Sequence, residues 1–291
     1  MHKLSITDVR AIAGDSAFLI DDGKTAILVD SGFAFTGDAV TAHIQEVLGA
    51  RPLDYIFLTH SHYDHVLGAA YVLHAYPDAC VVAGEYAAKI FAKDSAKALM
   101  RDLDRKFATA CGVGDYVDRI ENLRVDMAVS DGDVIRAGEM EFVAVALPGH
   151  TKCSMGFYLP ENRFLIGTET LGVYDGEGTL FPCFLVGYRM ALDSITKARS
   201  LDVEQLLLPH FGLLDCEKTA YYLDHAATAA TETVEAISTI LRDGGTEDEA
   251  IAWFKNRFYH GRITEAYPID AMMLNTSIMV RVIVRELLGR E

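Results

Sequence analysis

The segment YIFLTHSHYDHVLG joins an apolar run directly to a dense group of side chains that bind metals. Three histidines and one aspartate fall within six positions, namely His60, His62, Asp64 and His65. Side chains of an extended chain alternate between two faces, so His60 and His62 project in the same direction at the end of the expected strand 53–59. Asp64 and His65 then stand at the start of the helix that follows. This one strand-to-helix connection therefore offers two pairs of ligands and can serve two metals.

Further candidate ligands stand at the ends of later apolar runs. They are His150 in ALPGHTKCS, Glu169 in RFLIGTE and His210 in LLLPHFG. Strand ends converge at one edge of a sheet, which brings such side chains together. Imidazole with carboxylate suits zinc, iron or manganese, whereas calcium binds mainly oxygen ligands. Two alternatives are a polar loop whose histidines only form hydrogen bonds and an exposed position for Glu169 at a strand end. The repeated occurrence of candidate ligands after apolar runs favours a metal centre.

The order of the segments predicts two packed sheets. Residues 4–30 hold short β-rich runs separated by Gly-Asp and Asp-Gly turn signals, as in an antiparallel meander. Helix and strand patterns then alternate, with one helix closing at Gly49 and another over 84–110. Six apolar residues of that second helix are candidates for its buried face: Ile90, Phe91, Leu99, Met100, Leu103 and Phe107. A second strand-rich block runs from LRVDMAVS to VEQLLLPH, so we predict an α/β fold, a four-layer αββα sandwich.

The last part of the chain loses the strand pattern and predicts three helices. The second of them opens with Thr246 and Glu249 at capping-box spacing, and the third has Pro268 near its first turn. The sequence contains no linker or repeat that would separate this part from the rest. We therefore expect a body over residues 1–213 and a C-terminal helical extension over 214–291, which packs on the body as a cap and is not an independent domain.

The charge balance opposes binding to a phosphate backbone. The chain carries 26 basic and 42 acidic residues, a net charge of −16, whereas nucleic-acid binding depends on Lys and Arg. The N-terminus lacks a signal-peptide pattern, and no stretch approaches the roughly 18 apolar residues of a membrane helix. The five cysteines have no CxxC spacing, so we expect them to be reduced. A soluble, cytoplasmic protein with a small-molecule substrate follows, with no nucleic-acid or membrane partner, and an oligomer is compatible with the sequence.

Together these motifs resemble the metallo-β-lactamase fold superfamily over about residues 4–213. The matching features are HSHYDH, the Gly-His-Thr that contains His150, the carboxylate Glu169, His210 and the early turn Asp30-Ser31-Gly32. By that resemblance a first metal would be held by His60, His62 and His150, and a second by Asp64, His65 and His210. Glu169 would bridge the metals, and Asp30 would support the site from behind. Asp64 and Glu169 are then the expected catalytic carboxylates.

Glu169 departs from the family pattern, in which Asp is common at this position. One extra methylene lets the carboxylate reach further and swing, so it can bridge asymmetrically, bind one metal only, or favour a metal with looser geometry such as iron. The implied cofactors are two divalent metal ions, zinc or iron. Two cations roughly 3.5 to 4 Å apart lower the pKa of a shared water and polarise the substrate oxygen, which supplies a hydroxide nucleophile.

The expected function is that of a metal-dependent hydrolase using a metal-bridged hydroxide on a small ester, thioester, lactone or related substrate. Similar proteins with a helical extension include glyoxalase II-type thioesterases and the quinolone-signal response thioesterase. Two alternatives stay open. One is a di-iron oxidoreductase of the same fold, and the other is a metal-stabilised binding or regulatory protein with little turnover.

The substrate side of the site has two interpretations. Residues 170–188 mix glycines with aromatic residues, as in a substrate lid or in a connection whose aromatic rings lie in the core. Candidates for the pocket wall in the C-terminal part are Tyr221, Tyr222, His225, Tyr259 and His260. Three methionines, Met272, Met273 and Met279, are expected to pack the last helix into the core.

Overall fold

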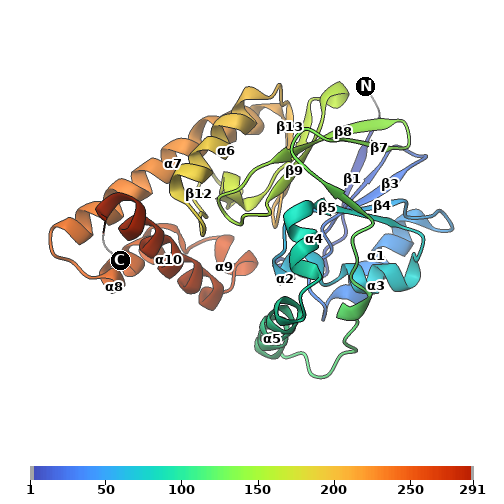
Figure 1. Ribbon diagram of the computed structural model, residues 1–291, viewed down its shortest axis with the longest axis horizontal. Coiled ribbons are helices and arrows are strands. Elements are labelled where there is room, and N and C mark those ends of the chain that lie inside the picture. The colour runs from blue at the N-terminus through green and yellow to red at the C-terminus, as the bar shows by residue number, and fades with distance from the viewer. Residues whose placement is uncertain (1–2, 290–291) are drawn as a thin grey trace. The chain divides into compact units, whose positions relative to one another are not determined.

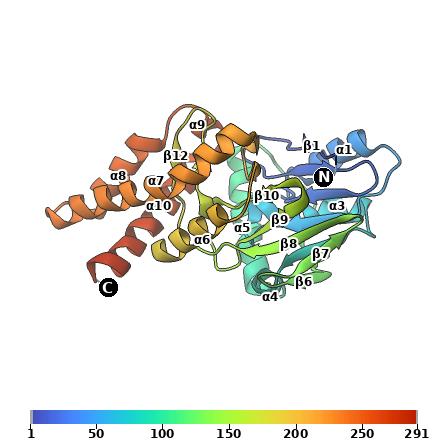
Figure 2. The same ribbon diagram turned by 90° about the horizontal axis from the view of Figure 1, so that it is seen from above.

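The computed structural model describes residues 3–289 of the chain (Figures 1 and 2). It contains helices and two six-stranded sheets, with strand orders β1-β2-β3-β4-β5-β6 and β14-β13-β10-β9-β8-β7. The described chain divides into two compact units, one formed by residues 3–146 and 155–162 and the other by residues 147–154 and 163–289. The mixed α/β fold with two sheets and C-terminal helices confirms the predicted fold class.

The first sheet begins as the predicted meander. Strands β1 (Ser5–Asp8), β2 (Phe18–Asp21) and β3 (Ala26–Val29) pair antiparallel. Strands β4 (Tyr55–Leu58), β5 (Cys80–Gly84) and β6 (Met127–Val129) then continue the sheet in parallel with β3. The carboxyl ends of parallel strands meet at one edge. Asp30 directly follows β3, and the histidine-rich segment follows β4, so both lie at this edge.

The helices of the first unit follow the predicted order with one correction. They are α1 (Gly37–Leu48), α2 (Tyr63–Val66), α3 (Ala69–Ala75), α4 (Glu85–Phe91), α5 (Asp94–Ala110) and the 3₁₀ turn η1 (Ile120–Asn122). The single helix predicted over 84–110 is wrong, because Lys93 adopts an extended conformation, φ −100° and ψ 122°, and separates α4 from α5. The buried face of α5 therefore does not continue that of α4, and Leu99 is 60% exposed rather than buried. Phe91 and Met100 are buried as predicted, and Ile90, Leu103 and Phe107 are half-buried.

The second strand-rich block is also present. In the first unit, β7 (Val134–Ala137), β8 (Met140–Ala146) and β9 (Met155–Leu159) form an antiparallel ribbon followed by the 3₁₀ turn η2 (Pro160–Asn162). In the second unit, β10 (Phe164–Ile166) pairs parallel with β13 (Gln205–Leu208), which turns back into β14 (Gly212–Leu214). Strand β14 and helix α6 (Tyr188–Ser200) were not predicted from the sequence.

Residues 170–188 are largely ordered by the core of the second unit. The 3₁₀ turn η3 (Glu169–Leu171) leads into a hairpin of β11 (Val173–Tyr174) and β12 (Leu180–Phe181). Phe181, Phe184 and Tyr188 are buried, whereas Tyr174 is half-buried. Three of the four aromatic rings therefore follow the core interpretation of this segment.

Helices dominate the end of the chain, as predicted. They are α7 (Cys216–Arg242), α8 (Glu247–Phe258), the short α9 (Ile263–Ala266) and α10 (Ile269–Ile283), which ends in the π-helical turn η4 (Val284–Leu288). The capping box of Thr246 and Glu249 is formed. Met272 and Met279 are buried in one core that also contains Phe181 and Phe184, whereas Met273 is only half-buried. Within residues 3–289, no helix combines the length and the apolar character needed to cross a membrane.

Gly68 allows the chain after α2 to approach the turn that follows β3. A Cβ atom at this position would lie 1.8 Å from the carbonyl oxygen of Ser31. The Gly68 amide donates to the Gly32 carbonyl at 3.0 Å, and the Ser31 amide donates to the His65 carbonyl at 2.7 Å. Glycine is required here because only a residue without a side chain permits this backbone contact.

We expect Gly68→Ala to lower the free energy of unfolding by about 3 kcal/mol, since backbone must move to admit the methyl group. Gly114→Ala is the matched control, because a Cβ at Gly114 would contact nothing within 4 Å. The control should change stability by less than about 0.5 kcal/mol. Urea denaturation of the two variants would measure the difference, and equal stabilities would contradict the proposed contact.

Asp104 is a buried carboxyl group on α5 that anchors the segment after the Asp30 turn. It accepts hydrogen bonds from the Ala34 amide at 2.9 Å and from the Tyr116 hydroxyl. Burial, the largest cause, raises the pKa of Asp104 from 3.8 to about 6, although the hydrogen bonds lower it. The folded chain thus holds this proton more tightly than the unfolded chain, so the contribution to stability is complete below pH 4 and is lost as the pH rises through 6.

Asp104→Asn should remove this pH dependence, because the amide does not ionise. The free energy of unfolding of the variant, relative to that of the native protein, should rise by up to about 3 kcal/mol between pH 4 and pH 7. Urea denaturation in a chelating buffer across that range would measure the trend. Asp102→Asn, which changes an exposed carboxylate on the same helix, controls for net charge. A pH-independent difference for Asp104→Asn would contradict the raised pKa.

Candidate metal centre

The histidine-rich segment forms a compact group of rings in the first unit. The ring centroid of His60 lies 4.6 Å from that of His62 and 4.0 Å from that of His65. Helix α2 begins at Tyr63, so Asp64 and His65 lie inside its single turn. Asp64 Oδ2 lies 3.6 Å from His65 Nε2. His60 and His65 are fully buried, and His62 and Asp64 are half-buried.

Asp30 holds two of these histidines from behind. Its carboxylate lies 2.7 Å from His65 Nδ1 and accepts from the Ser16 hydroxyl at 2.9 Å. It also accepts from the Thr59 amide at 2.8 Å and from the Thr59 hydroxyl at 3.0 Å, and that hydroxyl lies 3.2 Å from His60 Nδ1. Because Nδ1 of each ring faces this network, Nε2 is left as the nitrogen that can bind a metal.

Asp30 is also held in a rare backbone conformation. Its φ of 53° is one of three positive values among the non-glycine residues described, and His210, with φ 61°, is another. Such conformations cost free energy and persist where surrounding contacts fix them. Two residues of the predicted site therefore carry backbone strain.

In the second unit, His150 is fixed by η3 and by the segment before α6. The His150 amide donates to the Thr170 hydroxyl at 3.0 Å, and His150 Nδ1 lies 3.1 Å from the Cys183 carbonyl oxygen. A Cβ at the preceding Gly149 would lie 2.7 Å from Ala191 Cα, so this position requires glycine. His150 Nδ1 donates to the carbonyl, which leaves Nε2 as the available ligand atom.

The Glu169 carboxylate faces one histidine with each of its oxygens. Glu169 Oε1 lies 3.2 Å from His210 Nε2, and Glu169 Oε2 lies 3.5 Å from His150 Nε2. All three side chains are nearly inaccessible to solvent. His210 occupies the tight connection between β13 and β14, and Glu169 opens the η3 turn.

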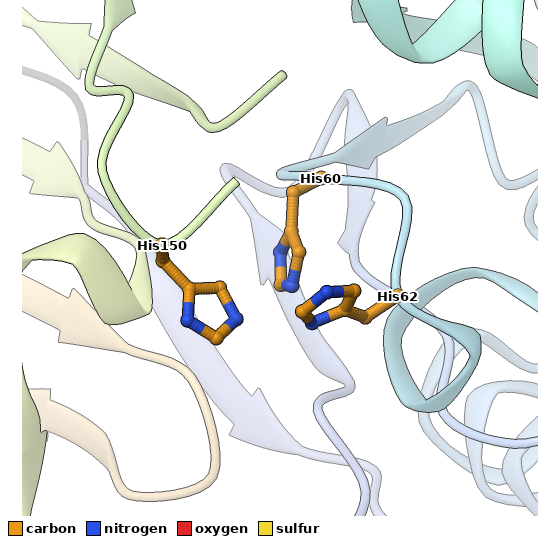
Figure 3. Close-up of side chains that lie close together, drawn as sticks. All are labelled: His60, His62 and His150. Carbon is orange, nitrogen blue, oxygen red and sulfur yellow. The ribbon is translucent and has the colours of Figure 1, made fainter. Parts of the chain in front are cut away.

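Candidate ligand atoms form two groups, each with its atoms within 4.8 Å of one another. The first contains His60, His62 and His150, whose rings are turned toward one another in Figure 3, and the second contains Asp64, His65, Glu169 and His210. Bonds of 2.0 to 2.1 Å to a tetrahedral zinc ion imply ligand atoms about 3.3 Å apart. Within the second group, the separations of 3.2 Å between Glu169 and His210 and of 3.6 Å between Asp64 and His65 agree with this value. The donor set therefore fits divalent metal ions.

Other residues chosen from the sequence have different environments. Tyr221 is 44% exposed and stacks on His225, at 3.9 Å between ring centroids. Tyr222 is fully buried. Three residues that orient the candidate ligands were not predicted from the sequence, namely Thr59, Ser16 and Cys183. Thr59 stands next to the histidine-rich segment and could have been suspected, whereas the carbonyl of Cys183 has no sequence signal.

The fold matches solved structures of one class. A metallo-β-lactamase family protein from Thermus thermophilus superposes with a TM-score of 0.61, over 93% of this chain and 88% of that protein, at 17% sequence identity. A family model described as the metallo-beta-lactamase superfamily matches residues 14–210. The chain belongs to this superfamily, as its motifs predicted.

Among curated relatives, proteins named hydroxyacylglutathione hydrolase are similar to this chain. The protein from Ruegeria pomeroyi is 30% identical over 183 residues, which are 61% of this chain and 56% of that protein. The one from Methylococcus capsulatus is 24% identical over 233 residues, which are 78% and 77% of the two chains. The chain thus spans little more than half the length of the first relative.

We expect Asp30→Asn to weaken metal binding about 10- to 100-fold, because the amide cannot accept from every donor that surrounds Asp30. Asp78→Asn, in an exposed turn, is the matched control and should bind metal normally. Competition with a chromophoric chelator would measure both dissociation constants. An unchanged affinity in Asp30→Asn would show that the network does not orient the ligands.

Proposed function

We propose that the protein is a metal-dependent hydrolase that holds two divalent metal ions, zinc or iron, and cleaves a small thioester or ester. The observation that carries this proposal is the orientation of Glu169, whose two oxygens face His210 and His150 at 3.2 and 3.5 Å. His150 belongs to one group of ligand atoms and His210 to the other. A carboxylate in that position suits a bridging ligand, the role that the family resemblance implies.

The ligand residues have separate tasks in this proposal. His60, His62 and His150 would hold one metal, and Asp64, His65 and His210 the other, with Glu169 between them. Metals in such a site lower the pKa of bound water and polarise a carbonyl oxygen. Asp30 keeps His65 in the tautomer that presents Nε2, and the Cys183 carbonyl does the same for His150.

A thioester is the preferred substrate class because the curated relatives are named for one such reaction. The hydroxyacylglutathione hydrolases match up to 78% of this chain. In the hydrolysis of a thioester, water oxygen forms a bond to the acyl carbon, the carbon–sulfur bond breaks, and the thiol leaves with a proton. The site contains five imidazoles and two carboxylates, and it needs no serine or cysteine nucleophile for this reaction.

The expected outcome of elemental analysis is close to two metals per chain, and the loaded protein should hydrolyse acyl-thioesters faster than phosphodiesters. His62→Ala should lower metal content and thioester hydrolysis together, since it removes a ligand atom. His74→Ala, which changes an exposed histidine of α3, is the control and should keep both. Absence of metal after reconstitution, or full hydrolysis by His62→Ala, would refute the proposal.

A further inference from the structure

Tyr222 is the most deeply buried polar aromatic residue beside the Glu169 turn. It lies in the second turn of α7, and its side chain has 0% exposure. Among residues 3–289, no group forms a hydrogen bond with its hydroxyl. Burying a hydroxyl without a partner costs free energy, because the group gives up its hydrogen bonds to water. Phenylalanine would fill the same space without this cost, so the hydroxyl calls for an explanation.

The hydroxyl of Tyr222 faces the end of η3. A Cβ at Gly172 would lie 3.4 Å from the hydroxyl oxygen. The Gly172 amide in turn donates to the Glu169 carbonyl at 2.9 Å. The φ of 104° at Gly172 favours glycine, so no side chain separates Tyr222 from this turn. The ring of Tyr222 is fixed by an edge-to-face contact with Tyr174, with centroids 5.6 Å apart.

Electrostatics keep this phenol in its neutral, donating form. Burial is the largest cause that raises the pKa of Tyr222 well above its ordinary value, and the negative charge of Glu169 is the next. The same charge that disfavours a phenolate attracts the positive end of the O–H dipole. A neutral phenol can donate one hydrogen bond to a carboxylate, either directly or through a water.

We propose that Tyr222 is a positioning residue for Glu169, whose carboxylate accepts a hydrogen bond from the Tyr222 hydroxyl directly or through one water when the metals are bound. The proposal rests on the proposed role of Glu169 as a metal ligand. Glu169 has one more rotatable bond than an aspartate, so its carboxylate has more freedom to turn away from His150 and His210. A donor fixed on α7 restricts that freedom.

The first test compares Tyr222→Phe with Tyr221→Phe in the metal-loaded protein. Tyr221 is the adjacent residue, is 44% exposed and stacks on His225, so it controls for loss of a hydroxyl from α7. Chelator competition should show about tenfold weaker binding of at least one metal in Tyr222→Phe. Absorption spectra of the cobalt-loaded proteins should differ from that of the native protein only for Tyr222→Phe.

Thermal unfolding of the metal-free proteins separates positioning from a purely structural role. Tyr222→Phe should unfold at the same temperature as the native protein or higher, because it removes a buried hydroxyl that has no partner. A lower unfolding temperature together with native metal affinity and a native cobalt spectrum would overturn the proposal.

A double-mutant cycle with Glu169→Asp tests whether Tyr222 acts through Glu169. If it does, the roughly tenfold effect of Tyr222→Phe on metal affinity should fall below about twofold in the Glu169→Asp background. An equal effect in both backgrounds would overturn the proposal. If the native protein binds two metals and Tyr222→Phe behaves identically, the role of Tyr222 is refuted and the proposed function is not. Native protein that binds no metal after reconstitution refutes the proposed function as well.

Discussion

The buried carboxylate of Asp30 is the interaction on which the histidine-rich segment depends. A charge without solvent access is tolerated only when hydrogen bonds surround it, and Ser16, Thr59 and His65 supply them. The same bonds orient two imidazole rings, one directly and one through Thr59. The need to satisfy one charge thus fixes the direction of two ligand atoms, and Gly68 lets the backbone after His65 approach the turn that follows Asp30.

Sequence reasoning worked where the relevant information was local. The spacing of His60, His62, Asp64 and His65 after an apolar strand predicts their common location, because strand geometry fixes which side chains project together. The meander, the end of α1 at Gly49 and the capping box at Thr246 are likewise set by neighbouring residues. The αβ order of the chain then determines the fold class, which similarity to solved structures confirms.

Sequence reasoning failed where a structure depends on distant residues or on a single backbone angle. The periodicity of residues 84–110 does not indicate the extended conformation of Lys93. The break there changes which positions of the following helix face the core, and Leu99 becomes exposed. The Cys183 carbonyl reaches His150 across 33 positions, and a main-chain acceptor leaves no trace in residue type. Tyr222 was a candidate for the pocket wall, and its side chain is fully buried.

The Glu169 side chain gains reach from its length but also gains conformational freedom. A longer carboxylate can face His150 and His210 at the same time, but each added bond also adds rotamers that must be excluded. Close packing alone does not select one rotamer when the alternative rotamers also place the carboxylate near candidate ligands. A directional donor does, because the strength of a hydrogen bond falls steeply as its angle departs from linear. On physical grounds, a glutamate in a bridging position therefore needs a hydrogen-bonding neighbour more than an aspartate does, and α7 places the Tyr222 hydroxyl beside Gly172 at the end of its turn.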